Sequence, residues 1–163
     1  MISRRHLAAA AAVSVLLGTA LTGCGDKASS EVTLTVGATP VPHADILKFI
    51  APALKKEGIN LKVVEFSDYV KPNLALADKE LDANFFQHVP YLESFAGERN
   101  LKLSVLCAVH IEPMGVYSKS VKSLSEVPEG AKVAIPNDPT NGGRALKVLE
   151  NAGLITLKDG VGV

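Results

Sequence analysis

The sequence has no tryptophan, only two cysteines and no excess of charge of either sign. A formal net charge of zero disfavours nucleic acid as a partner, because nucleic-acid binding depends on clustered positive charge. Two cysteines cannot form a disulfide framework. We expect Cys107, which lies in an apolar run, to be a small buried hydrophobic residue, with a reactive thiol as the alternative.

Motifs for catalysis and for metal binding are also missing. His43, His88 and His110 do not have the spacing of metal ligands, and there is no Cys-x-x-Cys or His-Glu-x-x-His sequence. Asp82 and His88 suit an acid–base pair, but no nucleophile motif accompanies them. We therefore expect no metal, no other cofactor and no enzymatic activity. An enzyme on the same architecture is kept as an alternative that turnover of a bound ligand would reveal.

The N-terminus has the three parts of an export signal. Residues 1–23 begin with basic residues and continue into an apolar run at 7–21 that is short for a membrane-spanning helix. The run ends in Leu-Thr-Gly-Cys, which resembles a bacterial lipobox, so we expect cleavage before Cys24 and a diacylglycerol on its thiol. A free or disulfide-bonded Cys24 is the alternative. Residues 24–31 are small and polar and predict a flexible tether.

The Arg-Arg pair near the start of the chain also resembles a weak twin-arginine export signal. A simple basic start to an ordinary signal explains the same residues. The route of export therefore stays open.

Strand and helix patterns alternate through residues 32–110. Alternating apolar residues predict strands, and apolar residues spaced three and four apart predict helices. The expected strands cover residues 32–36, 59–66, 81–86 and 101–111, and the expected helices cover residues 43–57, 72–80 and about 90–97. This alternation predicts an α/β fold with a parallel, doubly wound sheet.

Residues 111–163 begin a second unit with fewer elements. We expect strands at residues 114–118 and 132–135, a helical turn in the Ser-Leu-Ser-Glu sequence between them, and a helix at residues 141–151. These elements are too few to complete a sheet. We therefore expect the chain to be part of a larger fold.

Aromatic residues gather where predicted strands pass into helices, which is where open α/β sheets bind ligands. Phe86, His88 and Tyr91 follow one strand, and Tyr69 follows another. Aromatic faces with a few polar groups suit a ligand with an apolar, polarizable side chain. The alternative is that the rings belong to the core and His88 caps the next helix; for Phe85 we adopt the core interpretation.

A second candidate site lies at the start of the last predicted helix. Asn137, Asp138 and Thr140 offer caps, and the free N–H groups of a helix N-terminus attract anions. Arg144 adds a planar fork that suits a carboxylate. A surface arginine on a well-capped helix is the alternative.

Three long stretches, at residues 66–92, 117–146 and 153–162, resemble the NlpA-type lipoproteins, the methionine-binding lipoproteins of a bacterial ABC importer. The resemblance implies a periplasmic-binding-protein-like (type II) two-lobe α/β fold, with a nearly complete first lobe at residues 32–110 and a partial second lobe at residues 111–163. Members of the family continue well past the end of this sequence, so we expect half of a cleft.

The resemblance also implies the function and the roles of the site residues. Tyr69, Phe86, His88 and Tyr91 would surround the methionine side chain, while Asn141 and Arg144 would hold its α-carboxylate. The implied partners are L-methionine or a related small molecule, the membrane subunits of an ABC importer, and a membrane of the bacterial envelope, reached through the lipid on Cys24. The alternative is a truncated lipid-anchored envelope protein that keeps the fold without supporting transport.

Overall fold

The computed structural model describes residues 31–160. The predicted signal at residues 1–23, Cys24 and nearly all of the tether lie outside the described residues. No helix in the described part of the chain has the length and apolar character needed to cross a membrane.

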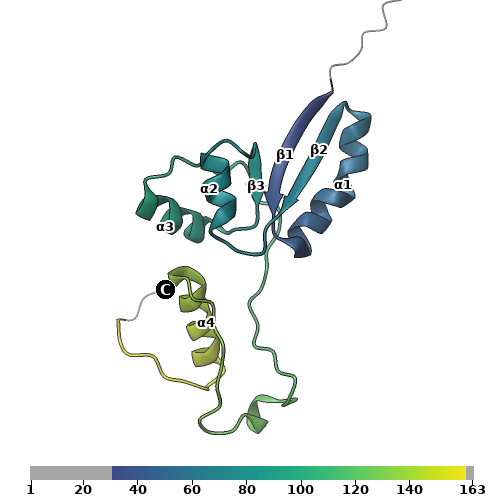
Figure 1. Ribbon diagram of the computed structural model, residues 1–163. Coiled ribbons are helices and arrows are strands. Elements are labelled where there is room, and N and C mark those ends of the chain that lie inside the picture. The colour runs from purple at the N-terminus through teal and green to yellow at the C-terminus, as the bar shows by residue number, and fades with distance from the viewer. Residues whose placement is uncertain (1–30, 161–163) are drawn as a thin grey trace, which may run out of the picture. The chain divides into compact units, whose positions relative to one another are not determined.

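The core element is a three-stranded parallel sheet (Figure 1). It is formed by β1 (Val32–Ala38), β2 (Ile59–Glu65) and β3 (Ala83–Phe85) in the order β2-β1-β3. The predicted parallel α/β sheet is therefore confirmed for the first three strands. β1 lies in the middle, so the carboxyl ends of all three strands meet at one edge.

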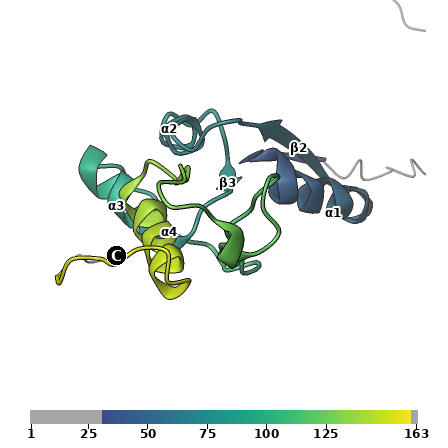
Figure 2. The same ribbon diagram turned by 90° about the horizontal axis from the view of Figure 1, so that it is seen from below.

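Helices connect the strands, as the alternation predicts. A short π-helical turn, η1 (Pro40–Ala44), leads into α1 (Asp45–Lys56), and β2 is followed by α2 (Lys71–Ala77). Figure 2 shows α1 and α2 on opposite faces of the sheet, because the chain moves from β1 to one side and then crosses to the other. α3 (Val89–Arg99) follows β3.

The two faces of β1 are packed differently. Val36 and Ala38 point to the α1 side, where they form a buried cluster with Ala44 and Leu47. Gly37 points to the other face, where a Cβ atom would lie only 2.6 Å from Cδ1 of Leu81. Because side chains alternate along a strand, one face of β1 carries apolar side chains. On the other face Gly37 leaves room for the side chain of Leu81 to lie close to the backbone.

The remaining predicted strands, at residues 101–111, 114–118 and 132–135, do not form. Within residues 100–138 the only regular element is the short 3₁₀ helix η2 (Leu124–Glu126), at the predicted helical turn. A strand needs a neighbouring strand to accept its backbone hydrogen bonds, and no described segment pairs with these. Cys107 is exposed, so the prediction that it is buried is wrong.

The last predicted helix does form, as α4 (Pro139–Asn151). It starts two residues earlier than expected, because Pro139 occupies the first turn, where its missing N–H costs no hydrogen bond. Ala145 and Leu149, one turn apart, are buried on one side of the helix. Within the described residues the second unit therefore consists of α4, η2 and extended chain.

Candidate ligand-binding cleft

An open cleft of about 560 Å³ lies at the carboxyl edge of the sheet. Its walls come from the loop after β2, from α3 and from the segment that enters α4. The lining residues are residues 67–70, Tyr91, Ser94, Phe95, Glu98 and Arg99 of α3, and residues 136–140. The position agrees with the rule that open α/β sheets bind ligands beyond the carboxyl ends of their strands.

Three predicted aromatic residues meet at this edge. The ring centroid of Tyr69 lies 5.7 Å from that of Phe86 and 6.0 Å from that of Tyr91, and Phe86 and Tyr91 are 6.0 Å apart. All three pairs are tilted or edge-to-face, the arrangement that aromatic quadrupoles favour. The structure therefore brings together residues from two different strand–helix junctions.

The three rings differ in exposure, and the difference separates their roles. Tyr69 is 48% exposed and lines the cleft, whereas Phe86 is only 5% exposed and packs with Tyr91 and Phe95 in a buried cluster. Tyr91 belongs to both the cluster and the cleft wall. Phe86 is thus part of the buried cluster in this structure, and its contact with a ligand stays a prediction. Phe85 packs against the α1-side core, as expected.

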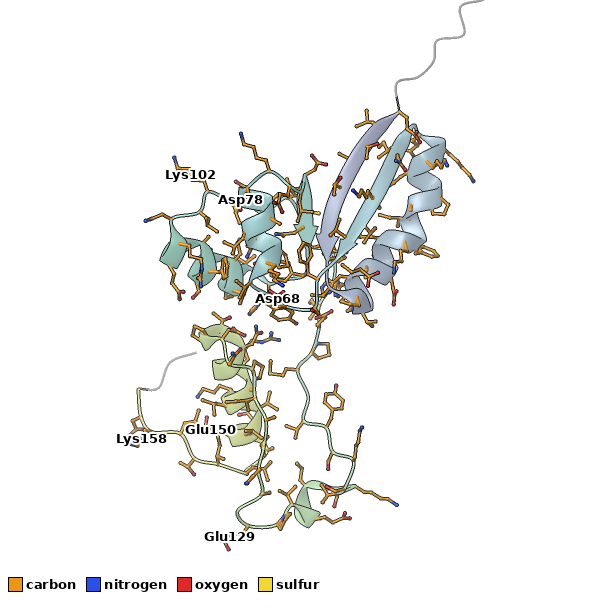
Figure 3. All side chains as sticks on the ribbon, viewed as in Figure 1. Asp68, Asp78, Lys102, Glu129, Glu150 and Lys158 are labelled. Carbon is orange, nitrogen blue, oxygen red and sulfur yellow. The ribbon has the colours of Figure 1, made fainter. Side chains whose placement is uncertain are left out.

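The loop that carries Tyr69 is held by local hydrogen bonds. Oδ1 of Asp68 accepts from the backbone N–H groups of Val70 and Lys71, each at 2.9 Å. These bonds hold the pKa of Asp68 below its usual value, together with the nearby Lys71 charge, while desolvation opposes them. Figure 3 shows Asp68 on the side of the sheet that faces α4.

His88 stands at the N-cap position of α3, but its side chain makes no capping hydrogen bond. His88 is therefore the cap residue that the alternative expects, but only through its backbone carbonyl, which accepts from the N–H groups of Tyr91 and Leu92. Nε2 of His88 is buried and has no hydrogen-bond partner among the described residues. Burial and the Arg144 charge lower the pKa of His88, while Asp138 partly opposes them, so the ring is neutral near pH 7.

A network of side-chain amides positions the β3–α3 junction, and the sequence analysis missed it. Asn73 of α2 is fully buried and exchanges two hydrogen bonds with Gln87, at 2.8 Å each, and it accepts a third from Asn84 at 2.9 Å. The network clamps α2 to the segment between Asn84 and His88. The available signal was the pair of amides that flank the two phenylalanines in the sequence.

Asp138 is the N-cap of α4, as its sequence position suggests. Its carboxylate accepts from the backbone N–H of Asn141 at 2.8 Å and from the hydroxyl of Thr140 at 2.8 Å. Burial raises the pKa of Asp138, but these hydrogen bonds outweigh burial, so the pKa lies below the usual value. The carboxylate is therefore ionised at neutral pH.

Arg144 and Asn141 are joined to this cap. The amide of Asn141 donates to both oxygens of Asp138, at 3.2 and 3.1 Å, and its Oδ1 accepts from Arg144 at 3.0 Å. Arg144 also donates to the backbone carbonyl of Glu112 at 3.3 Å. No carboxylate of the described residues forms an ion pair with Arg144, so its charge is available to an anion.

Of the predicted site residues, only Tyr69 and Tyr91 line the cleft itself. Phe86 packs against Tyr91 in the buried cluster, and His88, Asn141 and Arg144 lie outside the cleft lining. Asn141 is buried, and its side-chain amide already makes hydrogen bonds with Asp138 and Arg144. Its role is therefore to orient Arg144. Whether these residues bind a ligand stays a prediction.

Comparisons with known proteins place this arrangement in context. The NlpA lipoprotein family model matches residues 34–163. The methionine-binding lipoprotein MetQ of Bacillus subtilis is 50% identical over 141 residues, which cover 84% of this chain and 52% of that protein. The D-methionine-binding lipoprotein MetQ of Escherichia coli is 43% identical over 155 residues, which cover 94% of this chain and 57% of that protein.

Solved structures agree in fold. A nutrient binding protein from Burkholderia cenocepacia bound to methionine matches 80% of this chain and 54% of its own, with a TM-score of 0.75 and 47% identity. Lipoprotein Tp32 from Treponema pallidum matches with a TM-score of 0.76 and 42% identity, over 81% of this chain and 55% of its own. The chain spans about half the length of the curated relatives it matches.

Proposed function

Because the chain belongs to the NlpA lipoprotein family, we propose that it takes part in capturing methionine, or a close derivative, outside the cytoplasmic membrane. Delivery is to the membrane subunits of an ABC importer. The protein acts by reversible binding, without covalent chemistry. Methionine is supported as the class of ligand by two relatives, which are named as methionine-binding or D-methionine-binding lipoproteins.

The observation that carries the proposal is the pairing of two surfaces across the cleft. The aromatic wall of Tyr69 and Tyr91 lies on one side, and the capped N-terminus of α4 with Arg144 nearby lies on the other. Methionine needs both surfaces: its thioether gains about 0.3–1.5 kcal/mol from contact with an aromatic ring. Its carboxylate suits the guanidinium fork of Arg144, whereas the N–H groups of Asn141 and Gly142 at the start of the helix are already taken by Asp138.

An energy estimate sets the expected affinity. Burial of the methionine side chain contributes about 1.5–3 kcal/mol, and a charge-assisted hydrogen bond to Arg144 contributes about 1.5–3 kcal/mol. Association costs at least about 4 kcal/mol, while micromolar affinity needs about 8 kcal/mol net. Together with the thioether contact, these contributions exceed the cost by at most about 3.5 kcal/mol, so we expect this chain alone to bind methionine with a dissociation constant of several millimolar or weaker.

Weak binding calls for a method that detects it. Saturation-transfer NMR on the full chain, after circular dichroism has confirmed folding, should show transfer to L-methionine, strongest at its S-methyl group. L-norleucine, which replaces the thioether sulfur with a methylene, is the matched control ligand and should give a weaker signal. A folded chain with no transfer at about 100 mM methionine, well above a dissociation constant of several millimolar, would contradict the proposal.

A second candidate is a lipid-anchored envelope protein that keeps the fold without supporting transport. It is favoured by one observation: residues 101–111 and 132–135 form no strands, so the second wall of the cleft is formed by residues 136–140, the segment that enters α4, without a sheet behind it among the described residues. Methionine uptake by a bacterial strain that lacks its own binding lipoprotein separates the two. Restored uptake supports transport, and no uptake from a folded, anchored chain supports the second candidate.

The proposed location is the bacterial cell envelope, with the chain facing the periplasm or the exterior. Membership of a lipoprotein family supports this location in general terms. The anchor itself is proposed to be a lipid on Cys24, which lies outside the described residues.

A further inference from the structure

Three side chains that sequence spacing kept apart meet beside the sheet. Nε2 of His43 lies 3.6 Å from Oε1 of Glu112, and Nε2 of His110 lies 2.9 Å from the same oxygen. One ligand atom from each residue falls within 4.8 Å of the other two. His43 comes from the turn that leads into α1, while His110 and Glu112 come from the extended chain after α3.

His43 is held in place by its surroundings. The ring is buried, and Nδ1 lies 2.7 Å from the hydroxyl oxygen of Thr39, which is also buried. The ring of Phe85 contacts it edge-on at 4.6 Å between centroids and contacts His110 at 5.5 Å. A histidine whose second nitrogen is fixed by a hydrogen bond is oriented as metal-ligating histidines usually are.

The three ligand atoms converge on one small space. A neutral His110 whose Nε2 carries the proton donates to Glu112 at 2.9 Å, and a metal ion would take the place of that proton. Two imidazole nitrogens and one carboxylate oxygen within 4.8 Å of one another are the geometry on which the site rests.

We propose that His43, His110 and Glu112 bind one divalent transition-metal ion of the Zn²⁺ class, with a fourth position open to water. Two imidazole nitrogens and one carboxylate oxygen are a ligand set that Zn²⁺ uses and that Mg²⁺ and Ca²⁺, which prefer oxygen, do not. None of the three side chains lines the cleft, and the nearest link to it is the backbone carbonyl of Glu112, which accepts from Arg144.

The ligand atoms already lie near the spacing of a metal site, with adjustments at two of the three pairs. Zn²⁺ bonds of about 2.0–2.2 Å place the ligand atoms of a tetrahedral site about 3.3–3.5 Å apart. The His43–Glu112 distance of 3.6 Å fits, the 2.9 Å between His110 and Glu112 must open, and the two histidine nitrogens, which lie within 4.8 Å of each other, must close toward that range. The side chain of Glu112 is 51% exposed, so it can move without disturbing the core.

Metal binding would connect two distant parts of the chain. His43 follows β1, whereas His110 and Glu112 lie in a segment with no strand partner among the described residues. A bound ion would hold that segment against the sheet. Because the backbone carbonyl of Glu112 also accepts from Arg144, the ion would fix one of the contacts that orient Arg144.

Calorimetric titration of Zn²⁺ into the full chain tests the proposal, with Mg²⁺ as the control ion. We expect one equivalent of Zn²⁺ per chain and no saturable heat from Mg²⁺. Glu112→Gln and His110→Ala should each weaken Zn²⁺ binding by at least about tenfold, since even outer-shell changes cost that much. Glu129→Gln is the matched control in an exposed turn (Figure 3) and should bind as the unmodified chain does.

Cobalt spectroscopy gives an independent readout. Co²⁺ in the unmodified chain should show the intense visible absorption of a four-coordinate ion, and Glu112→Gln should lose it. Both test residues are at the surface, so folding of the variants can be verified by circular dichroism. Equal Zn²⁺ affinity in the unmodified chain and both variants, or a Co²⁺ spectrum like that of the ion in water, would overturn the proposal.

Discussion

The guanidinium of Arg144 donates a hydrogen bond to Oδ1 of Asn141 at 3.0 Å, and the amide of Asn141 donates in turn to the carboxylate of Asp138. The cap of α4 and its nearest cationic side chain are thus one connected unit. Asp138 fixes the amide of Asn141, and the amide fixes the orientation of the guanidinium. A change at the cap therefore reaches the proposed carboxylate-binding group without touching it.

Arg144→Ala should weaken methionine binding by at least about tenfold, because a charge-assisted hydrogen bond contributes about 1.5–3 kcal/mol. Methionine titrations followed by NMR on the unmodified chain and the variant provide the measurement. Lys147→Ala, which removes a charge one turn later on the same helix, is the control and should leave the affinity unchanged. Equal affinity in Arg144→Ala would remove the carboxylate role.

Asp138→Ala should lower the free energy of unfolding by about 0.5–2 kcal/mol, the usual cost of losing an N-cap. Urea denaturation followed by circular dichroism measures it. Asp78→Ala is the matched control, since Asp78 lies at the C-cap of α2, where a negative charge is unfavourable to the helix dipole. We expect that control to be neutral or slightly stabilising. A loss of the same size in both variants would show that capping is not the cause.

Gly37→Ala should destabilise the sheet by about 1–3 kcal/mol, the range for overpacking in a core. The new Cβ would lie 2.6 Å from Cδ1 of Leu81 and 2.9 Å from Cε2 of Phe66. Gly97→Ala is the control inside α3, where nothing lies within 4 Å, and it should gain about 0.5–1 kcal/mol from helix propensity. Comparable urea midpoints for the two variants would contradict the claim that β1 needs glycine at position 37 to avoid a clash.

Stability should fall as the pH drops below about 6.5, the ordinary pKa of histidine. Burial lowers the pKa of both His43 and His88 in the folded chain. In the acidic range the unfolded chain therefore binds protons that the folded chain does not, and the free energy of unfolding decreases with falling pH. Above that range both states are neutral at these histidines and no loss occurs.

Urea titrations at about pH 7.5 and about pH 5.5 measure this pH dependence. His88→Gln, which cannot titrate, should show a smaller loss of stability between the two values. The remaining loss is assigned to His43. An unchanged loss in His88→Gln would mean that burial of this ring does not contribute.

Cys24→Ala should release the protein from membranes, because the variant lacks the thiol that would carry the proposed lipid anchor. Fractionation of cells that express the unmodified chain and the variant gives the measurement, and Cys107→Ala is the matched control. Incorporation of a labelled fatty acid that persists in Cys24→Ala would remove the lipid assignment.

The pattern of residues 32–100 was sufficient to predict its local structure and its parallel sheet. The strand at residues 32–36 alternates apolar and polar residues, and the helix at residues 43–57 repeats at three and four, so local periodicity and the alternation of elements agree. Residues 101–111 were also predicted as a strand, from their apolar content alone. That prediction failed because a strand depends on a partner, and a partner is not a property of the segment itself.

For the candidate site, too, some features follow from the sequence and others only from the tertiary structure. By itself the sequence determined the kind of residue at each junction: aromatic rings after β2 and β3, a capped helix start before Arg144, and the stretches that indicate the family. Only the tertiary structure decided which of them is exposed, sealing Phe86 into the core and leaving Tyr69 open. It also brought His110 and Glu112 to His43, because contacts between residues far apart in the chain arise from packing, which spacing along the sequence does not encode.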